Sequence, residues 1–237
     1  MDGETRRRFL LGVGASALLV GCAKTVGGAA SPPASGEGEE DEDDVSPPED
    51  LMREHGALNR ILLIYEESGR RLDGGDAPPI EVVAGAAGII RKFIEQYHEK
   101  LEEDFLFPRF EKANVLVDLV ATLRRQHLAG RVLTEAILRL ATAEALQRET
   151  ERKELVATLA KFVRMYRPHE AREDTVLFPA FRHIVSPKEL DALGERFEDE
   201  EHRLFGKAGF DGIVDQVGEL EKRLGTYDLD AFTPTGP

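Results

Sequence analysis

The chain has 237 residues, of which 41% are hydrophobic, so its length allows one or two domains around one real core. The formal net charge of −14 at pH 7 repels phosphate backbones and argues against nucleic acid as a partner. The single cysteine excludes an internal disulfide and any zinc or iron–sulfur site built from cysteines. A metal in this chain must therefore be held by histidine and carboxylate side chains.

Residues 1–21 have the pattern of an export signal. Arg6 and Arg7 precede an apolar run of twelve residues, which is too short to span a bilayer as a helix. The run resembles a twin-arginine signal, and its end resembles a lipobox, in which Cys22 carries the lipid. The alternative is a cleaved secretory signal with an incidental cysteine. We expect an exported protein, lipid-anchored on the periplasmic side of a bacterial membrane.

Residues 22–46 are predicted to form an acidic tether. They are rich in glycine, alanine, serine and proline, and seven of the eight residues from 37 to 44 are acidic. A segment of this composition cannot bury apolar area, so we expect it to be disordered.

From residue 46 onward the hydrophobic pattern is helical, because apolar residues recur every three or four positions and no segment alternates with a period of two. Two capping boxes, at 46–49 and 186–189, mark helix starts. The predicted helices cover residues 47–72, 79–107, 115–146, 150–178, 187–205 and 213–224. Long helices with short connections predict an all-α protein: an antiparallel four-helix bundle at 47–182, followed by a C-terminal helical extension at 183–237.

Each long helix places one histidine on its apolar face, and two of the helices add a glutamate four residues later. Positions i and i+4 lie one turn apart on the same face, so both side chains reach one place. A buried carboxylate costs on the order of several kcal/mol unless it is paired or bound to a metal, so packing explains these residues poorly. Imidazole and carboxylate suit iron, manganese or zinc. The predicted ligands are His55, His98, Glu102, His127, His169 and Glu173.

An internal repeat links the second and fourth helices. Residues 98–110 read HEKLEEDFLFPRF and residues 169–181 read HEAREDTVLFPAF, and seven of the thirteen positions are identical without a gap. A bundle with pseudo-two-fold symmetry would give each copy half of a dinuclear site. The alternative is an old duplication kept for packing, in which the Leu-Phe pairs fill one end of the bundle.

The order and spacing of these ligands resemble the hemerythrin-like, HHE cation-binding family over about residues 48–182. Within that family the likeness is greatest to bacterial iron-centre repair proteins and to the animal iron-sensing F-box domain. The resemblance implies an up-down bundle that holds two non-haem iron ions. It implies that Glu102 and Glu173 bridge the ions and that the four histidines are terminal ligands.

The family usually supplies one more histidine than this chain does. Oxygen-carrying hemerythrins place it four residues after the histidine of the third helix, where this chain has Arg131. Glu99, Glu170 and His202 are the alternatives for the missing donor. Glu99 is favoured, because the iron-sensing relatives use a glutamate beside the histidine of the second helix.

Three functions fit this interpretation. The first is a di-iron protein of the cell envelope that handles oxygen, nitric oxide or peroxide, or that senses or stores iron. The second is a di-iron enzyme that reduces nitric oxide or peroxide or repairs iron centres. The third is a structural lipoprotein in which the metal stabilises the fold. We expect a metal- and ligand-binding protein rather than a dedicated enzyme.

Overall fold

The structure is a computed structural model that describes residues 45–234 and Gly236. The regular structure of this part is entirely helical, without a strand. The export signal at residues 1–21, with Arg6 and Arg7, and the proposed lipid site Cys22 lie outside the described residues, as does nearly all of the predicted tether. Among the described helices, none combines the length and the apolar character needed to cross a membrane.

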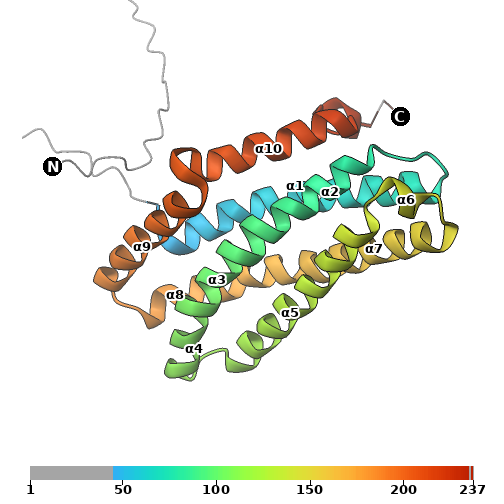
Figure 1. Ribbon diagram of the computed structural model, residues 1–237. Coiled ribbons are helices and arrows are strands. Elements are labelled where there is room, and N and C mark those ends of the chain that lie inside the picture. Colours follow the sequence, from blue (N-terminus) through green and yellow to red (C-terminus); the bar gives the residue numbers. More distant parts are fainter. Residues whose placement is uncertain (1–44, 235, 237) are drawn as a thin grey trace, which may run out of the picture. The chain divides into compact units, whose positions relative to one another are not determined.

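Four helical segments, each antiparallel to the next along the chain, form the predicted bundle (Figure 1). The first packs against the second and the fourth, and the third does the same. At one end of the bundle the second and fourth segments also contact each other, through α4 and α8. A short turn, α6 (Ala143–Leu146), joins the third segment to the fourth. The segments are α1 (Pro47–Asp73); α2 (Ile80–Ile89), α3 (Glu99–Leu101) and α4 (Phe107–Ala113) together; α5 (Val117–Leu140); and α7 (Glu149–Arg172) with α8 (Phe178–Ile184).

The second and fourth segments contain π-helical turns, at Ile90–His98, Glu102–Leu106 and Glu173–Leu177. The last two turns occupy equivalent places in the two copies of the sequence repeat. In each of them, the N–H of the phenylalanine that follows donates to the carbonyl of the glutamate five residues earlier. Such turns are rare and occur often at functional sites. Here both of them begin at a predicted bridging glutamate.

Two predicted helix ends are wrong, and in each case a proline of the repeat directly follows the residue at which the helix was predicted to end. The sequence predicts that the second and fourth helices end near Phe107 and Phe178, but they continue to Ala113 and Ile184. A proline stands at the second residue of each resumed helix, where its missing N–H is tolerated. The predicted third helix is also too long. It ends at Leu140, and Thr142 then caps the separate turn α6 by accepting the N–H of Ala145 at 3.1 Å.

The C-terminal extension belongs to the same compact unit as the bundle. Its helices, α9 (Pro187–Phe205) and α10 (Gly209–Leu224), pack against each other and against α1, and α10 also lies along α2 (Figure 1). Their contact face is apolar, and burial of each large side chain contributes roughly 1.5–3 kcal/mol. The buried apolar residues are Leu193, Phe197, Phe210, Ile213, Val217, Leu220 and Leu224.

Candidate metal centre

The six predicted ligands lie together inside the bundle, and all of them are at most 4% exposed. α1 contributes one histidine and α5 another. The second and fourth segments each contribute a histidine and, one turn later, a glutamate at the start of a π-helical turn. The spacing of four residues therefore brings the donors to one depth of the bundle, as the sequence predicts.

Each glutamate lies between two imidazole rings. The Oε2 atom of Glu173 is 3.1 Å from Nε2 of His169, on its own segment, and 3.4 Å from Nε2 of His55 on α1.

Glu102 has the equivalent surroundings. Its Oε2 atom is 3.4 Å from Nε2 of His127 on α5 and 3.9 Å from Nε2 of His98 on its own segment. All four histidines thus direct Nε2 towards a central carboxylate.

The four rings also form two pairs. The centroids of His55 and His98 are 4.7 Å apart, and those of His127 and His169 are 5.1 Å apart. Each pair joins a histidine that faces Glu102 to one that faces Glu173. We call the two places the His55–His98 position and the His127–His169 position. A cation at either place would meet two imidazoles and could share both glutamates with its neighbour.

An outer ring of acceptors orients the histidines. Every Nδ1 atom has a polar partner at 2.7 to 3.1 Å, and this contact fixes the ring and leaves Nε2 for the centre. The contacts are His55 with Asp174, His98 with Glu54, His127 with Glu103 and His169 with Gln126. Sequence reasoning missed these four acceptors. The signal for them was present, because each directly precedes or follows a predicted ligand in the chain.

The central donors make no hydrogen bond to a described residue, although each glutamate has imidazole rings within ion-pair distance. Both oxygens of Glu102 and of Glu173, and Nε2 of His127, are buried and make no hydrogen bond to any residue that the structure describes. Leaving such groups without a partner costs roughly 1–3 kcal/mol each, and more for charged groups. Imidazole with carboxylate is a donor set for iron, manganese or zinc, so the residues present fit a pair of such ions.

Burial and mutual contacts shift the pKa values of the cluster. Burial, supported by the charge of Glu173, raises the pKa of Glu102 to about 7. Burial alone would lower the pKa of His127, but its interactions with Glu102 and Glu103 outweigh this and raise that pKa to about 10. A cation needs the Nε2 lone pair of His127, so its binding must displace a proton.

Glu99, the favoured extra donor, is buried beside the His127–His169 position. A ligand atom of Glu99 lies within 4.8 Å of one on His127. Its Oε1 accepts the hydroxyl hydrogen bond of Tyr166 at 2.7 Å, and its Oε2 lies 2.8 Å from a guanidinium nitrogen of Arg131. Gly130 leaves room for the Tyr166 hydroxyl to reach Glu99, because a Cβ atom at residue 130 would lie 2.0 Å from that hydroxyl.

Glu170 and His202 differ sharply in their surroundings. Glu170 is buried near His55, its Oε2 accepts from the amide of Asn59, and its Oε1 makes no hydrogen bond to a described residue. Burial raises the pKa of Glu170 to about 8. His202 is exposed on α9 and belongs to none of the clusters of ligand-type side chains in the described chain. The structure therefore places Glu99 close to His127, buries Glu170 near His55 and leaves His202 exposed.

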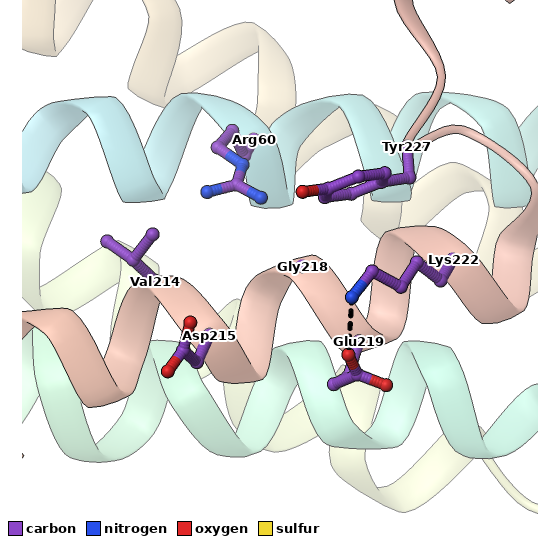
Figure 2. A pocket seen from close by; sticks show the side chains of 7 residues that line it. All are labelled: Arg60, Val214, Asp215, Gly218, Glu219, Lys222 and Tyr227. Carbon is purple, nitrogen blue, oxygen red and sulfur yellow. Dashed lines mark hydrogen bonds and ion pairs between the residues drawn. The ribbon is translucent and has the colours of Figure 1, made fainter.

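A surface pocket of about 400 Å³ lies elsewhere, between α1 and α10 (Figure 2). Lys222 donates to Glu219 at 2.6 Å there and lies 4.9 Å from the centroid of the Tyr227 ring. None of the predicted ligands lines this pocket. Its lining consists of Arg60, Val214, Asp215, Gly218, Glu219, Lys222 and Tyr227.

Comparisons with known proteins agree with this geometry. The family model of the hemerythrin HHE cation-binding domain matches residues 46–181, and that range contains all six predicted ligands. Uncharacterised proteins of Mycobacterium tuberculosis and Mycobacterium bovis are 50% identical to this chain over 234 residues, which cover 97% of this chain and 91% of theirs. No solved structure matches the chain.

Proposed function

The chain belongs to the hemerythrin HHE cation-binding family, and on this basis we propose that it binds two non-haem iron ions, one at each histidine pair. One observation carries the proposal: four Nε2 atoms converge on two buried glutamates whose oxygens make no hydrogen bond to a described residue. Glu102 and Glu173 would be shared between the ions, and Glu99 would be the further donor at the His127–His169 position.

The proposed role is that of a di-iron protein that binds or reacts with oxygen, nitric oxide or peroxide, or that senses or stores iron. Bound iron would supply redox chemistry and a coordination position for a small ligand. The chain supplies the surroundings. The outer ring orients the imidazoles, the buried glutamates provide charge, and the apolar core around them excludes water.

An absorption spectrum with metal analysis tests this proposal. The purified protein, reduced and loaded with ferrous iron, should show a new near-ultraviolet or visible band after exposure to air or nitric oxide. Iron should exceed manganese and zinc in the protein as purified from cells grown in iron-replete medium, because metal supply as well as affinity decides which ion a site holds. Zinc or manganese as the main metal of that protein, or no spectral change with either gas, would contradict the iron proposal.

We also propose that the protein is exported and lipid-anchored, a proposal that rests on Arg6, Arg7 and Cys22 of the sequence. Cys22→Ser should release the protein from membranes without changing its metal content, because Cys22 lies outside the ligand-bearing segment. Arg6→Lys together with Arg7→Lys should keep the precursor in the cytoplasm. A Cys22→Ser protein that still sediments with membranes after a salt wash would contradict the lipid anchor.

A further inference from the structure

The two cation positions are related by an approximate two-fold correspondence. The correspondence maps α1 onto α5 and the second helical segment onto the fourth. The two copies of the sequence repeat therefore map onto each other. Equivalent residues make equivalent contacts across the centre. The corresponding pairs are His55 and His127, His98 and His169, Glu99 and Glu170, Glu102 and Glu173, and Glu103 and Asp174.

The first break in this correspondence lies in the outer ring. Glu54 precedes His55 and contacts Nδ1 of His98 at 2.7 Å. The equivalent residue, Gln126, precedes His127 and contacts Nδ1 of His169 at 2.9 Å. One histidine therefore has a carboxylate behind it, whereas its counterpart has a neutral amide.

The second break lies one turn further along α1 and α5. Asn59 follows His55 by four residues, and its amide donates to Glu170. Arg131 follows His127 by four residues, and its guanidinium pairs with Glu99 at 2.8 Å and with Glu103 at 2.7 Å. A neutral donor on one side therefore corresponds to a cation on the other.

Both differences make the surroundings of the His127–His169 position less negative than those of the His55–His98 position. Relative to the His55–His98 position, the His127–His169 position loses one negative charge at Gln126 and gains one positive charge at Arg131. The other corresponding pairs named above carry the same kinds of ionisable group, so the formal charges around the two positions differ by two units. The amide also makes His169 a weaker donor than His98, because a carboxylate behind an imidazole raises the basicity of that ring.

We propose that the two positions are unequal: the His55–His98 position holds its cation tightly, and the His127–His169 position holds an exchangeable cation. A divalent ion in a buried site responds strongly to two unit charges in contact with its ligands. The tightly held ion would keep the centre assembled, whereas occupancy of the other position would follow the supply of free metal. This inference rests on the proposed two-ion function and adds to it which ion exchanges.

Calorimetric titration of the full chain with Co²⁺, under reducing conditions after chelator treatment, tests the inequality. We expect two ions that bind in separate phases, with affinities that differ at least about 10-fold. His169→Ala should remove the weaker phase and leave the tighter one. His55→Ala should remove the tighter phase. Circular dichroism should show unchanged helix content in both variants.

A charge-balancing pair of variants identifies the cause. Arg131→Asn, alone and with Gln126→Glu, copies Asn59 and Glu54 into the weaker position and should bring the two affinities together. Arg125→Asn is the matched control, because Arg125 is exposed on the same helix and the change in net charge is equal. The control should leave both phases in place.

The outcomes separate this inference from the function on which it rests. Two ions with equal affinity, a tighter His127–His169 position, or phases that Arg131→Asn and its control change equally would overturn the inference and leave the two-ion function standing. If the folded protein binds no Co²⁺ at all, the inference and the two-ion function are both overturned.

Discussion

Buried carboxylates occur in two regions of the molecule, the C-terminal helical pair and the centre of the bundle, and their surroundings differ. In the C-terminal pair, Glu221 accepts Nε–H of Arg60 at 3.0 Å and a second hydrogen bond from the same guanidinium. Glu201 accepts the backbone N–H of Phe210 at 3.0 Å. In the centre, no described residue donates a hydrogen bond to either oxygen of Glu102 or of Glu173.

The difference separates two reasons for burying a charge. Glu221 comes with an arginine that compensates it, so it links α10 to α1 at little net cost. The central glutamates face imidazoles that point at them with Nε2, and no arginine or lysine pairs with them among the described residues. A carboxylate in such a place is stabilised either by a protonated imidazole or by a bound cation, so the centre can exchange protons for metal. Glu221, by contrast, is compensated by Arg60 of the chain itself.

The largest effect should follow from removing a shared glutamate. Glu102→Ala or Glu173→Ala should weaken binding at both positions by at least about 100-fold, because each is proposed to serve both ions. Glu221→Ala is the contrasting change. It should leave metal content unaltered and lower the free energy of unfolding by about 1–3 kcal/mol. Metal analysis after equilibrium dialysis and urea unfolding measure the two effects. A Glu102→Ala protein with full metal content would erase the contrast.

Bound metal should stabilise the wild type but not a variant that lacks a shared glutamate. An ion that binds only the folded state at 100 times its Kd adds about 2.7 kcal/mol to the free energy of unfolding. The melting temperature of the wild type should therefore rise on metal addition and fall with a chelator, whereas that of Glu102→Ala should not respond. Scanning calorimetry measures both proteins. Equal melting temperatures of the wild type with and without chelator would contradict this expectation.

Metal binding should release protons at neutral pH. With its pKa raised to about 10, His127 holds a proton at pH 7 before a cation binds. A cation competes with this proton for Nε2, so its affinity should rise with pH above 7 and level off near 10. Ordinary histidines, with pKa values near about 6.5, would give no rise above pH 7.5. Titration calorimetry in buffers of different protonation enthalpy counts the protons, and a count of zero at pH 7 would contradict the shifts.

The smallest effect should come from Tyr166→Phe. This change removes the hydrogen bond to Glu99 and leaves the ring packed against Phe162 and His169. Loss of one such bond is worth about 1 kcal/mol, so affinity at one position should change by less than about 10-fold. Metal titration measures it, with Tyr65→Phe as the control, because the Tyr65 hydroxyl donates to no described residue. Loss of both ions in Tyr166→Phe would contradict the expected small effect at one position.

The sequence predicts the helices and the inward-facing histidines well, because the apolar period of three and four residues places His55, His127 and His169 on the buried stripe. It does not predict the resumption of the helices beyond Phe107 and Phe178. A proline is ordinarily read as a stop, and the π-helical turn that accommodates it depends on i to i+5 hydrogen bonds that no residue pattern specifies.

The outer ring was missed for a different reason. Glu54 and Gln126 lie one residue off the apolar stripe, so periodicity assigns them to the edge of each helix. In the folded bundle, Glu54 is only 1% exposed, because its neighbour in space is the imidazole of His98. His202 shows the converse. A histidine beside acidic residues suggests a ligand in the sequence, but the fold leaves it exposed on α9.

Equilibrium dialysis against ferrous iron, without oxygen and at a fixed free concentration, counts the ions that the centre of the bundle holds. Iron per chain should saturate at two in the wild type and in Glu221→Ala, and should stay near zero in Glu102→Ala at the same concentration. Saturation at one ion or none in the folded wild type, or iron uptake that is equal in the wild type and Glu102→Ala, would contradict the two-ion proposal.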